Sequence, residues 1–140
     1  MSFTRLRYHI IFSTKKRQPL LTPGVREFLY PQFEAISEAL GARTMAVGGV
    51  EDHVHTVTAI PPVLAISDFV RDLKSLSTTA LKDKFPHLCE FSWQVGFGCF
   101  SLSPDDLANV ISYVRNQPRH HEMNALWEKF ERIERRPPET

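Results

Sequence analysis

The chain has few cysteines, no excess of charge of one sign and no long apolar run. Its 140 residues include two cysteines, Cys89 and Cys99, which form no CxxC pair and are too few for a disulfide framework. We therefore expect two reduced thiols in the core. No segment approaches the roughly 18 apolar residues of a membrane span, and the first residues lack the apolar stretch of a secretory signal peptide. These absences predict a soluble, cytoplasmic protein without a membrane partner.

The charges are nearly balanced, although the basic residues are unevenly distributed. Seventeen Lys and Arg residues stand against 16 Asp and Glu residues, which leaves a formal net charge of +1. Bulk charge therefore does not indicate a polyanionic partner. The N-terminal third is nevertheless locally basic. This distribution is as compatible with a phosphate-binding surface as with an ordinary solvated one.

The length and composition fit one domain over residues 1–140. Hydrophobic residues make up 42% of the chain, which is enough for one core, and there is no internal repeat or low-complexity tract. Alternation between Leu6 and Phe12 predicts a strand with one apolar face. Helical spacing between Thr22 and Gly41 predicts an amphipathic helix, for which Pro31 indicates a kink or a late start.

The remaining segments complete an α+β pattern. Residues 44–50 and 53–60 are β-rich and joined by an acidic turn, which predicts a hairpin. A second amphipathic helix with a basic exposed side is expected over residues 64–85, and a final strand or bulged hairpin over the aromatic, glycine-punctuated residues 91–102. Ser103 and Pro104, followed by two aspartates, form a good helix start.

The helix that starts there is expected to reach Pro118, and a last amphipathic helix should cover residues 123–135. The order β, α, β, β, α, β predicts a ferredoxin-like fold, in which one antiparallel sheet carries two helices on one face. The two C-terminal helices are additions to this frame.

The most informative motif is His53-Val54-His55, at the start of the second hairpin strand. Side chains two apart on a strand leave the same face, so both imidazoles point together, as two ligands of one metal ion must. Neutral imidazole is the commonest metal-binding side chain. Such a pair also arises by chance in a chain with six histidines. A metal site therefore requires a further ligand and a reactive group elsewhere.

Tyr113 and Gln117 can supply both groups, because residues four apart lie on the same face of a helix. The carboxamide oxygen can coordinate a cation, and the phenol can attack an electrophile. The alternative interpretation is structural. Tyr113 would then pack beside Ile111 and Val114, and Gln117 would be a polar residue at a helix end.

Several segments occur together in the order and spacing of a known family. They are YHIIFSTK at residues 8–15, GVEDHVH at 49–55, Trp93-Gln94 with Phe100-Ser101, and YVRNQ at 113–117 followed by His120-His121. Together they resemble the single-tyrosine HUH transposases, the TnpA type of small bacterial and archaeal insertion sequences, with the REP-associated tyrosine transposases as a sister group. The resemblance extends from about Arg5 to His121. Thr56 departs from it, because the family usually has an aliphatic residue there.

The resemblance implies a DNA transposase that cleaves and rejoins single-stranded DNA at hairpin-bearing element ends. Tyr113 would be the nucleophile and would form a 5′-phosphotyrosine intermediate, while His53, His55 and Gln117 would hold Mg²⁺ or Mn²⁺. Two imidazoles suit manganese or zinc better than magnesium. A homodimer is implied as well. His120 and His121 are left out of the metal set.

Other roles follow from the charged residues. Asp52 or Glu51 could orient a ligand histidine, although turn residues are often acidic. We expect DNA phosphates to contact a set of basic residues. This set is Arg5, Arg7, Lys15, Lys16, Arg17, Arg71 and Lys74.

Three alternative functions remain open. The chain could be a domesticated protein that binds single-stranded DNA hairpins without transposition activity. It could be a small metal-dependent hydrolase in which water attacks in place of Tyr113, or a purely structural oligomer. The complete set of nucleophile and ligands favours the transposase.

Overall fold

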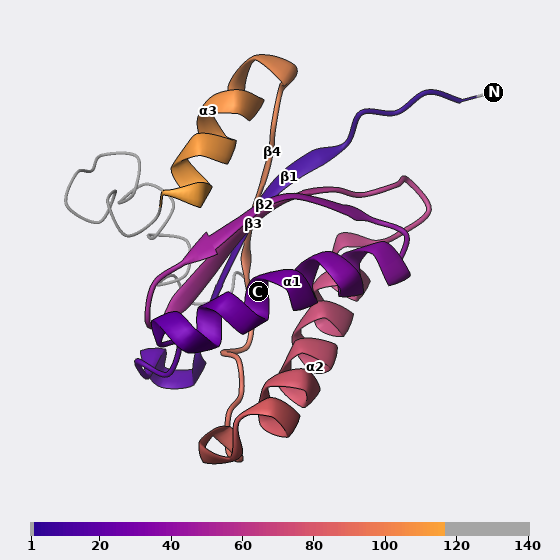
Figure 1. Ribbon diagram of the computed structural model, residues 1–140. Coiled ribbons are helices and arrows are strands. Elements are labelled where there is room, and N and C mark those ends of the chain that lie inside the picture. The colour runs from indigo at the N-terminus through magenta and orange to yellow at the C-terminus, as the bar shows by residue number, and fades with distance from the viewer. Residues whose placement is uncertain (1, 117–140) are drawn as a thin grey trace.

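The computed structural model describes residues 2–116 of the chain (Figure 1). Gln117, the two histidines after it and the helix expected over residues 123–135 lie outside the described residues. The elements in chain order are β1 (Arg7–Ser13), the 3₁₀ turn η1 (Lys15–Arg17), α1 (Pro23–Ala39), β2 (Arg43–Gly49), β3 (His53–Ala59), α2 (Ile66–Lys84), the 3₁₀ turn η2 (Pro86–Leu88), β4 (Gly98–Ser101) and α3 (Pro104–Arg115).

The four strands form one antiparallel sheet in the order β2-β3-β1-β4. Helices α1 and α2 lie side by side on one face of this sheet, and α3 lies on the other (Figure 1). The predicted α+β, ferredoxin-like arrangement is therefore confirmed, with β3 and β1 in the middle of the sheet. Helix α3 covers the face of the sheet that α1 and α2 leave open.

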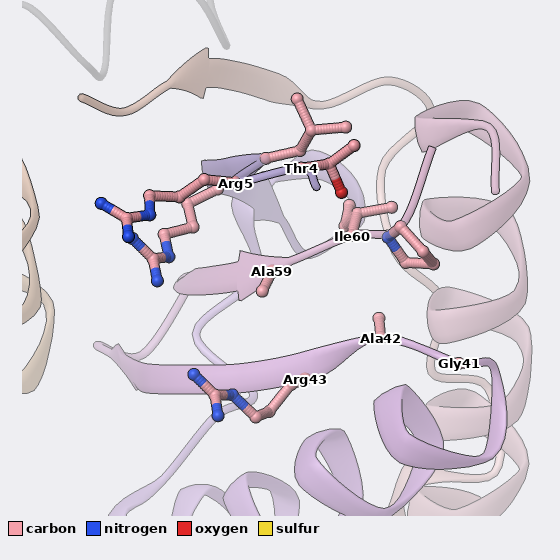
Figure 2. A pocket seen from close by; sticks show the side chains of 10 residues that line it. Thr4, Arg5, Gly41, Ala42, Arg43, Ala59 and Ile60 are labelled. Carbon is pink, nitrogen blue, oxygen red and sulfur yellow. The ribbon is translucent and has the colours of Figure 1, made fainter. Parts of the chain in front are cut away.

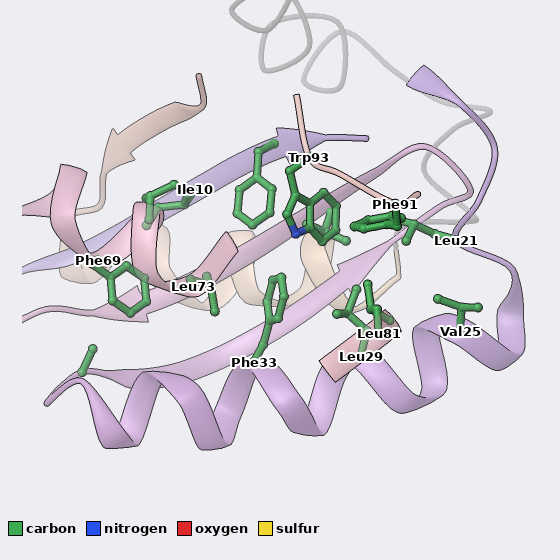
Figure 3. Close-up of a cluster of buried hydrophobic side chains, with 14 of the residues drawn as sticks. Ile10, Leu21, Val25, Leu29, Phe33, Phe69, Leu73, Leu81, Phe91 and Trp93 are labelled. Carbon is green, nitrogen blue, oxygen red and sulfur yellow. The ribbon is translucent and has the colours of Figure 1, made fainter. Parts of the chain in front are cut away.

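The main core lies between the sheet and helices α1 and α2. Phe33 from α1 has its ring centroid 6.4 Å from that of Trp93, which precedes β4, and Phe69 from α2 belongs to the same buried cluster (Figure 3). The indole Nε1 of Trp93 donates a 3.1 Å hydrogen bond to the buried hydroxyl of Ser77. Since a buried indole N–H needs an acceptor, this bond fixes where the segment before β4 crosses α2.

A second core lies under α3. Val110 and Val114 of the helix pack on Ile11 of β1 and Val57 of β3. Both faces of the central strands are therefore covered, and six of the seven β3 residues are buried. The apolar face expected of β1, with Ile10 and Phe12, packs in the main core. The other face of β1 contacts α3 through Ile11.

The helix starts predicted at Ser103 and at Thr22 both agree with the structure. Ser103 caps α3 and accepts a 3.3 Å hydrogen bond from the Asp106 backbone N–H, with Pro104 at the first helical position. Helix α1 begins at Pro23 and continues through Pro31, so the late start considered for Pro31, as the alternative to a kink, does not occur. The Thr22 cap sets the beginning of α1, since its hydroxyl accepts from the Val25 N–H at 3.4 Å.

The aromatic run before α3 forms less strand than expected. Only Gly98–Ser101 pairs with β1, while Trp93 makes an isolated bridge to Thr14. Gly96 has a φ of +93°, which turns the backbone. Lys74 Nζ donates to the carbonyls of Gln94 at 2.7 Å and Gly96 at 2.6 Å, so these groups face α2 and are not available to a strand ladder.

The expectation that both thiols lie in the core is wrong for Cys89, which is exposed just after η2, whereas Cys99 is partly buried. No helix within residues 2–116 has the length and apolar character needed to cross a membrane.

Candidate active site

The two motif histidines lie on β3, on the sheet face that α3 covers. His53 and His55 are both 0% exposed, and their ring centroids are 5.2 Å apart with planes inclined at 67°. Neighbouring strands β1 and β2 hold β3 on both sides. The alternation expected from the sequence therefore brings both imidazoles to one place, as two ligands of one ion require.

An acidic turn residue holds the first histidine. Asp52 Oδ1 lies 2.6 Å from His53 Nδ1, and Arg17 Nε donates to Asp52 Oδ2 at 3.3 Å. Burial alone would raise the pKa of the Asp52 carboxyl. The hydrogen bond from His53 and the electrostatic attraction of His53 and Arg17 outweigh burial and lower that pKa to about 2. An ionised Asp52 accepts from Nδ1–H, so Nε2 is the ring nitrogen through which His53 can bind a metal.

A third histidine holds the second one. His9, on β1, places its Nε2 2.8 Å from His55 Nδ1, and both rings are fully buried. Burial lowers the pKa of His9 to about 4, so the ring is neutral at physiological pH. When His55 Nδ1 donates this bond, its Nε2 becomes the nitrogen that can bind a metal. Each motif histidine thus has a partner on Nδ1, the usual arrangement around metal-bound imidazoles.

The sequence analysis did not identify His9 as a site residue. The signal was present in the strand pattern, since His9 is out of phase with the apolar Tyr8, Ile10 and Phe12. Only the pairing of His9 with Val57, two residues from His55, shows what it contacts. Glu51, the other acidic turn residue, is exposed.

Helix α3 brings Tyr113 to the histidines of its own chain. The phenol ring is edge-on to His55, with centroids 5.9 Å apart, and lies 6.3 Å from the ring of His9. Tyr113 is 4% exposed. The structural interpretation of Tyr113 is therefore correct as far as packing goes, since the ring belongs to the second core. The same packing brings the phenol beside the histidines.

Gly48 of β2 allows this close approach. A Cβ atom at this position would overlap the backbone carbonyl oxygen of Val114, the residue after Tyr113. Helix α3 therefore lies flush against β2, and the absence of a side chain at Gly48 sets how deeply the tyrosine sits.

The donor set fits a metal ion only in part within the described residues. No group of three or more His, Cys, Asp or Glu side chains in residues 2–116 could hold an ion. His53 and His55 offer two nitrogens, each oriented through its Nδ1. Gln117, the proposed third ligand, lies outside the described residues. The pair alone supplies two ligands, fewer than the about four to six that a bound divalent metal ion takes.

Three of the predicted DNA-contacting residues, Lys15, Lys16 and Arg17, form η1 beside this site. The turn is tied to the segment before β4, because the Lys16 N–H donates to Gln94 Oε1 at 3.1 Å. Lys15 and Lys16 are exposed, whereas Arg17 is partly buried against Asp52. The turn therefore presents two lysines to solvent next to His53.

The other four lie further away. Arg71 and Lys74 belong to α2, on the opposite side of the sheet from α3 (Figure 1). Arg71 is ion-paired at 3.2 Å with Asp68 and at 3.1 Å with Asp72, and Lys74 binds two backbone carbonyls. The two aspartates compensate the charge of Arg71, and the two carbonyls hold the Lys74 ammonium against the segment before β4. Arg7 is the first residue of β1, and Arg5 lies in the segment before it.

Comparison with known proteins agrees with this arrangement. A family model described as IS200-like transposase matches residues 2–117. The ISDra2 transposase TnpA of Deinococcus radiodurans is 27% identical over 118 residues, which cover 81% of this chain and 84% of the relative. The transposase for insertion sequence element IS200 of Salmonella typhimurium is 25% identical over 122 residues, covering 84% and 80%.

Solved structures show the same fold. A crystal structure described as that of a transposase from Deinococcus radiodurans R1 superposes with a TM-score of 0.70 at 28% identity, covering 83% of this chain and 93% of the other. A REP-associated tyrosine transposase bound to a REP hairpin gives a TM-score of 0.64 at 16% identity, covering 86% and 72%. At that identity the second likeness concerns the fold alone. Because the family model spans nearly all described residues, the chain belongs to the IS200-like transposases.

Proposed function

We propose that this transposase cleaves and rejoins single-stranded DNA through Tyr113, with Mg²⁺ or Mn²⁺ held by His53, His55 and Gln117. The observation that supports this most is the position of the Tyr113 ring, 5.9 Å from His55. Two elements distant in the sequence thus bring a phenol to a pair of oriented imidazoles. Both imidazoles also have a polar partner on Nδ1, which is the usual arrangement around metal-bound histidines.

The proposed reaction exchanges one phosphodiester for another. The Tyr113 oxygen loses its proton and attacks the scissile phosphorus, which forms a phosphorus–oxygen bond to the tyrosine. The bond to the 3′ oxygen breaks, and that oxygen takes up a proton as a free 3′ hydroxyl. Because the energy of the broken bond is kept in the tyrosine ester, the 3′ hydroxyl of another strand can reverse the reaction and join new partners without ATP.

A phenol with a pKa near 10 is mostly protonated at neutral pH, so the step needs help. A divalent cation held by the histidines would polarise the scissile phosphate and favour the phenolate. The protein's own contribution is orientation. Asp52 fixes the His53 ring and His9 fixes the His55 ring, while the docking of α3 on β2 sets the position of Tyr113.

The proposed substrate is single-stranded DNA that carries a hairpin at the element end, and the proposed assembly is a homodimer. One neighbour of the same fold is a REP-associated tyrosine transposase bound to a REP hairpin. Lys15 and Lys16 of η1 are exposed beside His53 and suit contact with phosphates near the cleaved bond. Light scattering of the purified protein, alone and with DNA, tests the dimer.

The experiment that tests the function is a denaturing gel. Protein is incubated with end-labelled single-stranded hairpin DNA from the flanking genome, with Mn²⁺, with Mg²⁺ or with chelator. We expect a protein-linked DNA band that requires metal and disappears in Tyr113→Phe. Tyr8→Phe is the matched control, since Tyr8 packs against the main core on the opposite face from the histidines.

The possible outcomes separate the alternatives. Loss of the band in Tyr113→Phe with DNA affinity retained supports the transferase. Cleavage that persists in Tyr113→Phe without a covalent band would indicate a hydrolase. Binding without cleavage under any metal condition would refute the proposal and indicate a hairpin-binding protein.

A further inference from the structure

Two arginines lie in one row across the sheet. Arg7 of β1 is opposite Ala59 of β3, and Ala59 is opposite Arg43 of β2. Residues directly opposite one another in a sheet project from the same face. Neighbouring strands are about 4.8 Å apart, so the two arginines stand about 10 Å apart with a methyl group between them. This spacing leaves room for an anionic group between the guanidinium groups.

The row is on the face of the sheet that carries the candidate active site. Arg7 precedes His9 by two residues on β1, and Ala59 follows His55 by four residues on β3. Both spacings are even, so the row and the histidines project to the same side. At about 3.3 Å per residue, the row lies about 13 Å from His55. Because α3 covers Val57 between them, a DNA strand that contacts both the row and the histidines passes beside the helix.

The row forms the cationic end of a pocket. The pocket has a volume of about 290 Å³, and Arg5 from the segment before β1 also lines it. Figure 2 shows the guanidinium groups of Arg5 and Arg43 pointing to the same side, while Ala42 and Ile60 lie at the other, apolar end. The volume is at the lower limit of the range of about 300–1,000 Å³ for ligand pockets, which suits a ligand as small as one nucleotide.

The charges of the row are not compensated within the described part of the chain. No ion pair in residues 2–116 includes Arg5, Arg7 or Arg43. Arg71 on α2 is different, because two aspartates contact it. Three arginines on one pocket repel each other unless an anion binds, and arginine is the side chain best suited to phosphate.

We infer that Arg5, Arg7 and Arg43 bind the phosphates of the single DNA strand that leads to Tyr113, with one nucleotide in the pocket. This inference rests on the proposed function, since it assigns a path to the same substrate. It adds Arg43, which the sequence had not indicated as a contact. It also separates this row from Arg71 and Lys74 of α2, whose charged groups already have partners within the chain. With a rise of at least about 3.4 Å per nucleotide, the contacted phosphate lies within about four nucleotides of the cleaved bond.

The test measures binding without metal, so that cleavage plays no part. Fluorescence anisotropy gives the dissociation constant for a labelled hairpin with a single-stranded extension, in chelator, over a series of salt concentrations. For single strands, each phosphate contact contributes about 0.7 to the slope of log affinity against log salt. We expect Arg7→Gln and Arg43→Gln each to lower the slope by about 0.7, and the triple variant with Arg5→Gln by about 2.

Arg71→Gln is the matched control, since it removes the same charge from the opposite face. An unchanged slope in the triple variant would refute the inference. An equal decrease in Arg71→Gln would refute it too, because net charge alone would then explain the effect. Lysine replacements at the three positions keep the charge and should keep the slope.

A second measurement uses the unmodified protein. A set of DNAs carries one uncharged methylphosphonate linkage each, at successive positions of the single-stranded extension. Binding should be weaker when the neutral linkage faces the row. The triple variant should lose this dependence on position. Absence of any such position in the wild-type protein would contradict the inference. This result does not depend on a covalent tyrosine adduct. An error in the proposed function can therefore be distinguished from an error in the proposed role of the arginine row.

Discussion

Replacing Gly48 by alanine should impair catalysis more than it impairs folding. A Cβ at this position would overlap the carbonyl oxygen of Val114, which belongs to the backbone of α3 and cannot rotate away. To restore ordinary contact, either α3 or β2 must move by about 1 Å or more. Strand β2 is paired along its length with β3, so we expect the helix to move. Tyr113, the preceding residue, moves with it.

The magnitude follows from this displacement. A misplacement of about 1 Å at a reacting group can slow a reaction about 100-fold, which corresponds to about 2.7 kcal/mol in the activation barrier. Overpacking destabilises a fold by about 1–3 kcal/mol, against a total stability of about 5–15 kcal/mol for a domain. The variant should therefore remain folded while adduct formation falls by about two orders of magnitude.

The assay compares rates of covalent adduct formation for the wild type and Gly48→Ala, with hydrogen exchange of the α3 amides as a readout that does not need activity. Gly24→Ala is the control, because a Cβ at Gly24 meets nothing within 4 Å. Mn²⁺ affinity should fall too, since the proposed third ligand, Gln117, follows Tyr113 by four residues. A wild-type rate with unchanged exchange of α3 would show that flush docking at Gly48 does not position the tyrosine.

Three further predictions concern the surroundings of the site. His9→Leu removes the hydrogen bond to His55 and should weaken Mn²⁺ binding about 10–100-fold in calorimetry. His9→Gln keeps an acceptor and should retain most of the affinity. Equal losses in the two variants would contradict the role of this hydrogen bond. Trp93→Phe leaves a buried serine hydroxyl without its donor and should lower the free energy of unfolding in urea by about 1–3 kcal/mol. Burial raises the pKa of Cys99 to about 11, so about one Cys99 thiol in a thousand is ionised at pH 8. Iodoacetamide should therefore modify the exposed Cys89 first. Equal rates of modification of the two cysteines, measured by mass spectrometry, would refute this.

Local patterns in the sequence were sufficient to predict several parts of the molecule. The His53-Val54-His55 unit has the period of a strand, and Ser103-Pro104 has the composition of a helix start. Both depend on residues within a few positions, where side-chain direction and backbone hydrogen bonding are set by local geometry. The element order was also sufficient for the fold class.

Features that depend on distant contacts were missed. Pro31 indicated a kink or a late start, whereas α1 begins before it and remains helical through it. A strand or bulged hairpin was expected through Gln94 and Gly96, whereas Lys74, about twenty residues earlier, binds both carbonyls. In each case tertiary contacts override the local preference of the segment.

The register of β1 against β3 explains why the site could be only partly predicted. His9 contacts His55 because His9 is opposite Val57, and Arg7 joins Arg43 in one row because both are opposite Ala59. A shift of one residue would move His9 and Arg7 to the main core and break both arrangements at once. The orientation of the proposed metal ligands and the position of the arginine row are therefore set by the same pairing. Substitutions that loosen β1 should weaken metal binding and DNA binding together.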